Sequence, residues 1–197
     1  MEEIERCYIL SIRKYKEKDY NNIVNVCLDT CDPVVQQEPI NEYVKLMFCR
    51  YYIEKEPDNC VVLTDENDVA VGYVYGAQDY DNYHKNMSEY LQGIAEVENG
   101  IFLPHAYVEM YNHYIYKDEY PAHLHIDIFG EHRSKGYGSD MIKTFCDNLK
   151  NKDIRGVMLI VGADNVRAQR FYEKNGFTLL EKKSSGYAYG KKLMEDK

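Results

Sequence analysis

The sequence lacks any apolar run of the length that a membrane span requires. About eighteen consecutive apolar residues are needed to cross a bilayer as a helix, and no stretch of this 197-residue chain comes near that length. The first ten residues, MEEIERCYIL, are acidic and lack the basic region and apolar core of a secretory signal peptide. We therefore predict a cytoplasmic protein with no membrane partner.

The chain also lacks an excess of positive charge. Its formal net charge is −9, whereas a nucleic-acid-binding protein needs a basic surface for the phosphates, so we predict no nucleic-acid partner. The charge is unevenly divided, however. Residues 131–174 hold nine Lys/Arg against six Asp/Glu, a balance of +3, which leaves −12 on the remainder. The one basic part of the chain is therefore where an anionic ligand is expected.

Cysteine spacing gives no sign of a disulfide framework or a metal site. Cys27 and Cys31 stand four residues apart, as neighbours on a helix face would, but no second pair completes a set of ligands. We expect reduced thiols and no metal. The six cysteines are Cys7, Cys27, Cys31, Cys49, Cys60 and Cys146.

Hydrophobic periodicity in the first half of the chain predicts alternating strands and helices. We expect a strand over 8–15, helices over 20–28 and 41–52, a hairpin over 60–78, and a helix over 84–98. Seven of the twenty tyrosines lie between Tyr80 and Tyr116. We interpret 79–122 as an insertion, within a single domain of 1–197, that shapes the site of an acceptor.

The second half has the clearest pattern. An apolar run over 156–162 is typical of a buried parallel strand. We expect a strand over 122–129, a loop over 130–138, helices over 139–150 and 164–176, and further strands over 177–182 and 186–193. The class is therefore α/β, with a mixed, mostly antiparallel sheet, a central parallel βαβ unit and flanking helices.

The loop HRSKGYGSD joins the strand of this unit to its helix. A helix N-terminus offers unpaired backbone N–H groups and a partial positive charge, and glycines let an anion approach the backbone. The loop therefore suits a pyrophosphate. The dinucleotide fingerprint fails because Met141 stands where its third glycine belongs, and the Gly-Lys-Ser/Thr of an ATP-type loop is missing as well.

Two motifs together resemble the GNAT superfamily of acyl-CoA-dependent N-acyltransferases. The first is Arg133-x-x-Gly136-x-Gly138 after a strand. The second follows the next strand and comprises Asn165, Ala168, Phe171-Tyr172 and Gly176-Phe177. The resemblance covers roughly 120–180. A narrower one, on YPAHLHIDIF and VGADNVRAQRFYEKNGF, is to the acetyltransferase-like domain of bifunctional O-GlcNAcases and its bacterial stand-alone relatives.

The resemblance implies the GNAT fold, with acetyl-CoA as co-substrate and no metal. It implies that backbone N–H groups of the loop hold the pyrophosphate and that the strand from Ile126 to Ile128 pairs with the pantetheine. Asn165 is carried over as a pantetheine contact, although helix capping would explain it equally well. The implied cofactor residues are Ile126, Ile128, Arg133, Ser134, Lys135, Gly136, Tyr137, Gly138, Ser139, Asn165, Ala168 and Tyr172.

Catalytic roles rest on two observations. The resemblance places Tyr172 near the cofactor sulfur, where a phenol can protonate a departing thiolate; a core aromatic beside Phe171 is the alternative. Independently, His123, His125 and Asp127 share one face of the strand by the period of two. The histidines are candidates for the general base, because a histidine titrates near neutral pH and can take the proton of an amine. Asp127 could orient a histidine or bind a cationic amine. The alternative is that all three hydrogen-bond to the insertion. The opposite face is apolar: Ala122, Leu124, Ile126 and Ile128.

The function predicted from these residues is acetyl-CoA-dependent N-acetylation by direct attack of an amine in a ternary complex. The acidic remainder favours a cationic acceptor, either a small-molecule amine or a lysine. The alternative is a non-catalytic acyl-CoA-binding or interaction domain, because the O-GlcNAcase group includes domains thought to have lost activity. The oligomeric state stays open, a homodimer included.

Overall fold

A seven-stranded sheet forms the centre of the molecule. The computed structural model describes residues 10–184 and 186–194. The strand order is β1-β2-β3-β4-β5-β7-β6, and every neighbouring pair is antiparallel except β4 and β5. The bounds are β1 Ser11–Lys14, β2 Cys60–Thr64, β3 Ala70–Ala77, β4 Ala122–Ile128, β5 Gly156–Val161, β6 Thr178–Lys183 and β7 Gly186–Lys192. Tyr8, expected in the first strand, lies outside the described residues.

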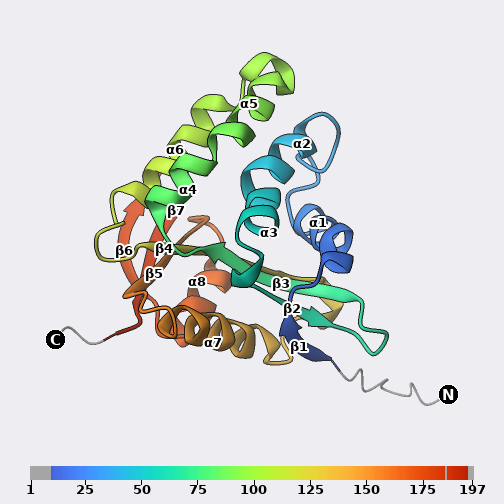
Figure 1. Cartoon of the computed structure of the whole chain (residues 1–197), viewed down its shortest axis with the longest axis vertical. Coiled ribbons are helices and arrows are strands. Elements are labelled where there is room, and N and C mark those ends of the chain that lie inside the picture. The colour runs from blue at the N-terminus through green and yellow to red at the C-terminus, as the bar shows by residue number, and fades with distance from the viewer. Residues whose placement is uncertain (1–9, 185, 195–197) are drawn as a thin grey trace.

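Helices cover both faces of this sheet (Figure 1). Helices α1 to α6 pack on one face, and α7 and α8 pack on the other. The bounds are α1 Tyr20–Asp29, α2 Ile40–Lys45, α3 Tyr51–Lys55, α4 Tyr80–Asn86, α5 Ser88–Glu96, α6 Leu103–Tyr114, α7 Tyr137–Lys150 and α8 Val166–Lys174. The expected mixed sheet with its parallel βαβ unit, β4-α7-β5, is confirmed. Within the described residues no helix is long and apolar enough to cross a membrane.

The two faces of the sheet bury chemically different cores. Aliphatic side chains dominate beneath α7, where Leu124 of β4 and Leu159 of β5 meet Ile142 and Phe145 of the helix. On the other face the core is rich in tyrosine, with Tyr51 and Tyr52 of α3 packed against Tyr73 and Tyr75 of β3. Buried tyrosines bring hydroxyl groups into the interior, and these need partners. This second face therefore holds polar groups close to the sheet.

Three helical expectations differ from the structure. The helix expected over 41–52 is a run from 40 to 55 whose middle, Leu46–Arg50, is a π-helix. The helix expected over 84–98 is divided at Met87 into α4 and α5. Helix α6 was not predicted at all. The signal was present in the sequence, since Leu103, Ala106 and Met110 recur at helical spacing.

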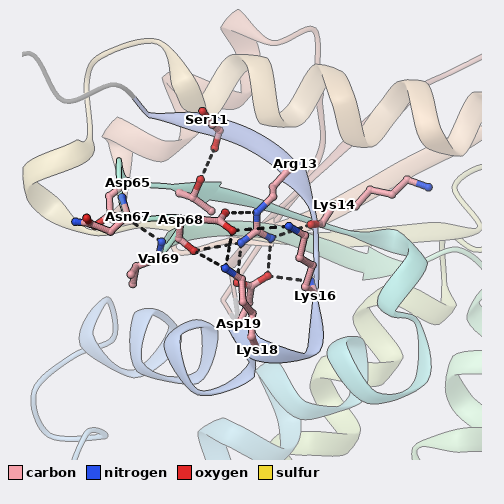
Figure 2. Close-up of polar contacts among 11 residues, drawn as sticks. Ser11, Arg13, Lys14, Lys16, Lys18, Asp19, Asp65, Asn67, Asp68 and Val69 are labelled. Carbon is pink, nitrogen blue, oxygen red and sulfur yellow. Dashed lines mark hydrogen bonds and ion pairs between the residues drawn. The ribbon is translucent and has the colours of Figure 1, made fainter.

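An ion-pair network fastens the first strand to the β2–β3 hairpin, as Figure 2 shows. The Arg13 guanidinium donates to both carboxylate oxygens of Asp19, at 2.7 and 2.9 Å, and to Asp68 in the hairpin turn at 2.5 Å. Asp19 also accepts the backbone N–H of Lys16 at 2.8 Å. Asp19 immediately precedes α1 and Arg13 belongs to β1, so this network joins the start of the helix to the sheet. Asp19 is only 1% exposed.

We expect Asp19→Ala to lower the free energy of unfolding by about 1.5–3 kcal/mol, the usual worth of hydrogen bonds to a charged group. Burial alone would raise the pKa of Asp19, but the bonds from Arg13 and from the Lys16 backbone outweigh it and hold that pKa below its usual value. Stability from this pair is therefore present above about pH 4 and lost as the pH falls through the folded pKa. Urea titrations at pH 7 and pH 3 check this, and a variant as destabilised at pH 3 as at pH 7 would contradict it.

Candidate functional site

A cavity of about 400 Å³ opens between the end of β4 and the N-termini of α7 and α8. Its lining comes from four places: the end of α1, the second half of β4, the glycine loop, and one face of α8. The residues are Thr30, Ile126, Asp127, Ile128, His132, Arg133, Ser134, Gly136, Tyr137, Gly138, Ser139, Asn165, Arg167, Ala168, Phe171, Tyr172 and Lys174. Eleven of the twelve predicted cofactor residues are in this set; Lys135 is not.

The cavity exists because the two parallel strands diverge. Strands β4 and β5 pair only at Ala122 with Val157 and at His123 with Met158. On its other side β4 stays paired with β3 as far as Ile128. The edge of β4 that faces β5 therefore leaves the ladder after His123. An extended chain bearing amides could add to such an edge as a strand does.

The glycine loop takes backbone conformations that favour glycine. Gly136 caps α7 with φ 93°, in the left-handed region, and an added Cβ there would meet nothing within 4 Å. Ser134 also has a positive φ, of 65°. Gly138, in the first turn of the helix, lies so close to Phe171 that a Cβ would stand 3.2 Å from its ring. The helix begins at Tyr137, two residues earlier than expected, so its first free N–H groups lie at the cavity.

Helix α8 supplies the opposite wall. The Asn165 side chain accepts the backbone N–H of Ala168 at 3.0 Å, so it caps the helix and lines the cavity at once. The Arg167 guanidinium reaches across and donates to the Ser134 hydroxyl at 3.0 Å, which joins α8 to the loop. Arg133 turns inward and donates to the carbonyl of Ile128 at 2.6 Å. Two cations thus stand beside the loop, each held by a hydrogen bond.

Asp127 is the acidic group of the cavity. The Tyr73 hydroxyl donates to its Oδ2 at 2.9 Å, because the antiparallel register places these two residues opposite each other. Burial raises the pKa of Asp127 to about 6, and the Tyr73 bond and the charge of Arg133 offset only part of that rise. A carboxyl group with this pKa is ionised at neutral pH and is a stronger base than an exposed aspartate.

Tyr172 lines the same cavity from α8 and is nearly buried. Burial, with the nearby charge of Asp127, raises the pKa of its hydroxyl above the ordinary value. The phenol is therefore fully protonated at neutral pH. Asp127 and Tyr172 thus line the same cavity, the first ionised and the second protonated at neutral pH.

His123 and His125 do not line the cavity. Both Nε2 atoms lie 3.0 Å from the hydroxyl of Tyr52, which bridges the two rings. His123 is 1% exposed and stacks on His113 of α6 with ring centroids 4.1 Å apart. Burial lowers the pKa of His125 to about 4 and holds that of His123 well below its ordinary value. The polar face expected on β4 is thus present; His123 is buried, whereas His125 and Asp127 are partly exposed.

Sequence reasoning missed several residues at this site. Thr30 and His132 line the cavity, and no motif marked either. Tyr73 and Tyr52, which hold the polar groups of β4, were missed because their partners are distant in the chain. The alternation Tyr73, Tyr75 was a usable signal, since residues two apart on a strand share a face. Among the described residues no group of three or more His, Cys, Asp or Glu could hold a metal ion.

Comparison with known proteins agrees with this fold. A family model described as the acetyltransferase (GNAT) family matches residues 23–177. The solved structure of SsHAT is 23% identical, with a TM-score of 0.80, over 94% of this chain and 99% of that one. PaiA N-acetyltransferase from Thermoplasma acidophilum, solved with coenzyme A, is 16% identical with a TM-score of 0.57, over 93% and 98%. YncA from Salmonella typhimurium, solved with its cofactor acetyl-CoA, is 12% identical with a TM-score of 0.60, over 95% of each chain.

Proposed function

Since the chain belongs to the GNAT family of acetyltransferases, we propose that it transfers the acetyl group of acetyl-CoA to an amine held above Asp127. The observation that carries this proposal is the joint placement of Asp127, Tyr172 and the glycine loop on one cavity. Acetyl-CoA would supply an activated thioester. The new C–N bond replaces the C–S bond, one proton leaves the amine, and one proton reaches the thiolate.

The residues present fit this co-substrate. N–H groups at the start of α7 and the charge of Arg167 favour the pyrophosphate. The unpaired edge of β4 from Ile126 to Ile128 favours the amides of the pantetheine. Gly136 and Gly138 keep the approach to the backbone free of side chains. Lys174, at the end of α8, adds a second cation at the rim.

We assign the general base to Asp127 rather than to either histidine. The Tyr52 hydroxyl has one proton and two imidazole partners, so it donates to one Nε2 and accepts from the other. The Nδ1 of His123 is buried and has no hydrogen-bond partner among the described residues. An orphaned acceptor is more common in proteins than an orphaned N–H, so His123 donates through Nε2 and Tyr52 donates to His125. His125 then uses its one lone pair, at Nε2, to accept from Tyr52 and carries its proton on Nδ1, so this ring has no free basic nitrogen.

Tyr172 is proposed as the general acid. Burial keeps the hydroxyl protonated at neutral pH, and a phenol beside the sulfur can donate its proton as the C–S bond breaks. The same burial that raises this pKa removes competing water. Asp127 and Tyr172 would therefore act on opposite sides of the reacting carbon, one on the incoming amine and one on the departing sulfur.

The acceptor is proposed to enter over the tyrosine-rich face. Helices α4 to α6, the insertion of 79–122, cover the β4 face that carries Asp127; Tyr83 and His113 pack directly on His123. We propose an amine on a small molecule or a lysine side chain. The narrower resemblance to the acetyltransferase-like domain of O-GlcNAcases remains a prediction from the sequence.

Acetyl-CoA and free CoA are expected to raise the melting temperature, whereas ATP and NAD are not. A ligand at about a hundred times its Kd adds about 2.7 kcal/mol, which is a shift of about 5–10 °C for a protein of this size. Tyr172→Phe is the matched variant. Acetyl-CoA should raise its melting temperature as it does for the unaltered protein, but its rate of CoA thiol release with an amine acceptor should be at least tenfold lower. Differential scanning fluorimetry and a thiol assay over an amine panel measure the two.

The two readouts separate the proposal from its alternatives. A shift with turnover that falls in Tyr172→Phe supports acetyl transfer. A shift with no turnover over a broad amine panel indicates the non-catalytic acyl-CoA-binding domain instead. No shift at millimolar CoA would overturn both, because each requires the cavity to bind this cofactor.

A further inference from the structure

A second cavity, of about 580 Å³, lies between α4 and α6 and shares no lining residue with the first. Its walls are aromatic, with four tyrosines and one histidine among seven residues. The lining comprises Tyr80, Asp81, His84, Tyr107, Met110, Tyr111 and Tyr114. We call it the tyrosine pocket. Its volume is in the range of small-molecule sites.

The tyrosine pocket exposes rings that a folded protein usually covers. Tyr107, Tyr111 and Tyr114 are 56%, 59% and 49% exposed, and spacings of four and three place them on one face of α6. Elsewhere in the chain tyrosines such as Tyr52 and Tyr73 are fully buried. Exposed aromatic clusters at a hollow mark binding sites more often than chance.

The chain itself shows which group these rings attract. The Lys117 ammonium lies 5.4 Å from the ring centroid of Tyr114 and 5.9 Å from that of Tyr80. It is anchored there by an ion pair of 2.5 Å with Asp81. Within the described residues no ammonium lies over the ring of Tyr107 or Tyr111. Lys117, which is not part of the lining, thus lies over two rings that are, and Tyr107 and Tyr111 add two more rings of the same kind to the pocket.

We propose that the tyrosine pocket binds an organic cation whose nitrogen carries methyl groups. Ring faces attract positive charge electrostatically. A primary ammonium brings three N–H donors that need acceptors, and Lys117 already uses Asp81 as its own. A trimethylammonium group has no N–H to satisfy, and its methyl groups pack against the rings of Tyr107 and Tyr111.

Calorimetric titration of the full chain tests this with three probes. They are choline, its uncharged isostere 3,3-dimethyl-1-butanol, and a short peptide with one trimethyl-lysine. We expect choline to bind at least tenfold more tightly than the isostere, which has the same shape without the charge. Tyr111→Leu, which keeps an apolar side chain but removes the ring, should weaken choline binding about fivefold. Val108→Ala, exposed on α6 but outside the lining, should not change it.

Each outcome decides the proposal. Equal affinity for choline and the peptide supports it with a small molecule as the source, and a much tighter peptide supports it with a modified protein side chain as the source. The proposal is overturned if the isostere binds as well as choline, if neither cation binds at millimolar concentration, or if Tyr111→Leu binds like the unaltered chain. The thermal shift with acetyl-CoA shows that each variant is folded.

Discussion

Asp127→Asn is expected to lower kcat by about 10²–10⁴-fold, the usual contribution of a positioned general base. Asparagine has nearly the same shape and still accepts the hydrogen bond from Tyr73, so the cavity should stay intact. In the unaltered protein kcat should fall below about pH 6, because the base form is lost as Asp127 takes up a proton near that pH. The pH profile of the Asp127→Asn variant should not show this fall. Release of CoA thiol between pH 5 and 8 measures both.

Stability distinguishes loss of the base from loss of the fold. The pKa of Asp127 is raised in the folded state, so its ionised form disfavours folding at pH above the ordinary value of about 3.9. Asp127→Asn removes this cost, and the variant should be at least as stable as the unaltered protein at pH 8. A variant that retains more than a third of the activity would assign the base elsewhere, with His125 as the next candidate.

Tyr73→Phe is the matched control. The Tyr73 hydroxyl favours the ionised carboxylate and so lowers the pKa of Asp127 relative to burial alone. Removing this hydroxyl should raise the pH below which kcat falls, without abolishing activity. A variant in which this pH does not rise would show that another group titrates there.

Gly76→Ala is expected to be the most damaging small substitution to stability. Gly76 lies in β3 opposite Leu124 of β4. A Cβ there would stand 1.9 Å from the backbone oxygen of His123 and 2.9 Å from the ring of Phe145. Neither the strand nor the α7 side chain can yield without moving β4. We expect a loss of about 3 kcal/mol, the upper end of overpacking effects, and a fall in melting temperature of about 6–12 °C.

Gly130→Ala is the control for Gly76→Ala. An added Cβ at Gly130 meets nothing within 4 Å, so the change should stay within about 0.5 kcal/mol. Thermal and urea unfolding of the two variants measure the difference. Equal stability would mean that β3 and β4 can separate at this point without cost, which the register of the two strands argues against.

The half of the fold around the cavity was predictable because its signals are local. The apolar run of β5, the cap at Asn165 and the glycine loop each act within a few residues, and the structure has all three. The cofactor residues followed from matching those local motifs to a family. All of them except Lys135 line the cavity, and their contacts with a cofactor stay a prediction.

What the sequence could not predict depends on register and on distant partners. Nothing local marks Tyr73 as the residue opposite Asp127 or Tyr52 as the bridge between two histidines; both follow from how strands and helices meet in space. Helix α6 was missed although Leu103, Ala106 and Met110 recur at helical spacing. Its exposed tyrosines form the tyrosine pocket, so the helix that the prediction omitted also carries a candidate site.

The short seam between β4 and β5 has a mechanical consequence. Only two residue pairs join β4 to β5. The sheet therefore has two parts, β1 to β4 and β5 to β7, which backbone hydrogen bonds connect at one end only. A ligand bound between β4 and β5 beyond His123 would contact both parts of the sheet and oppose their separation. Under the proposed function, acetyl-CoA would be such a ligand, and its concentration would then set how firmly the two parts of the sheet are held together.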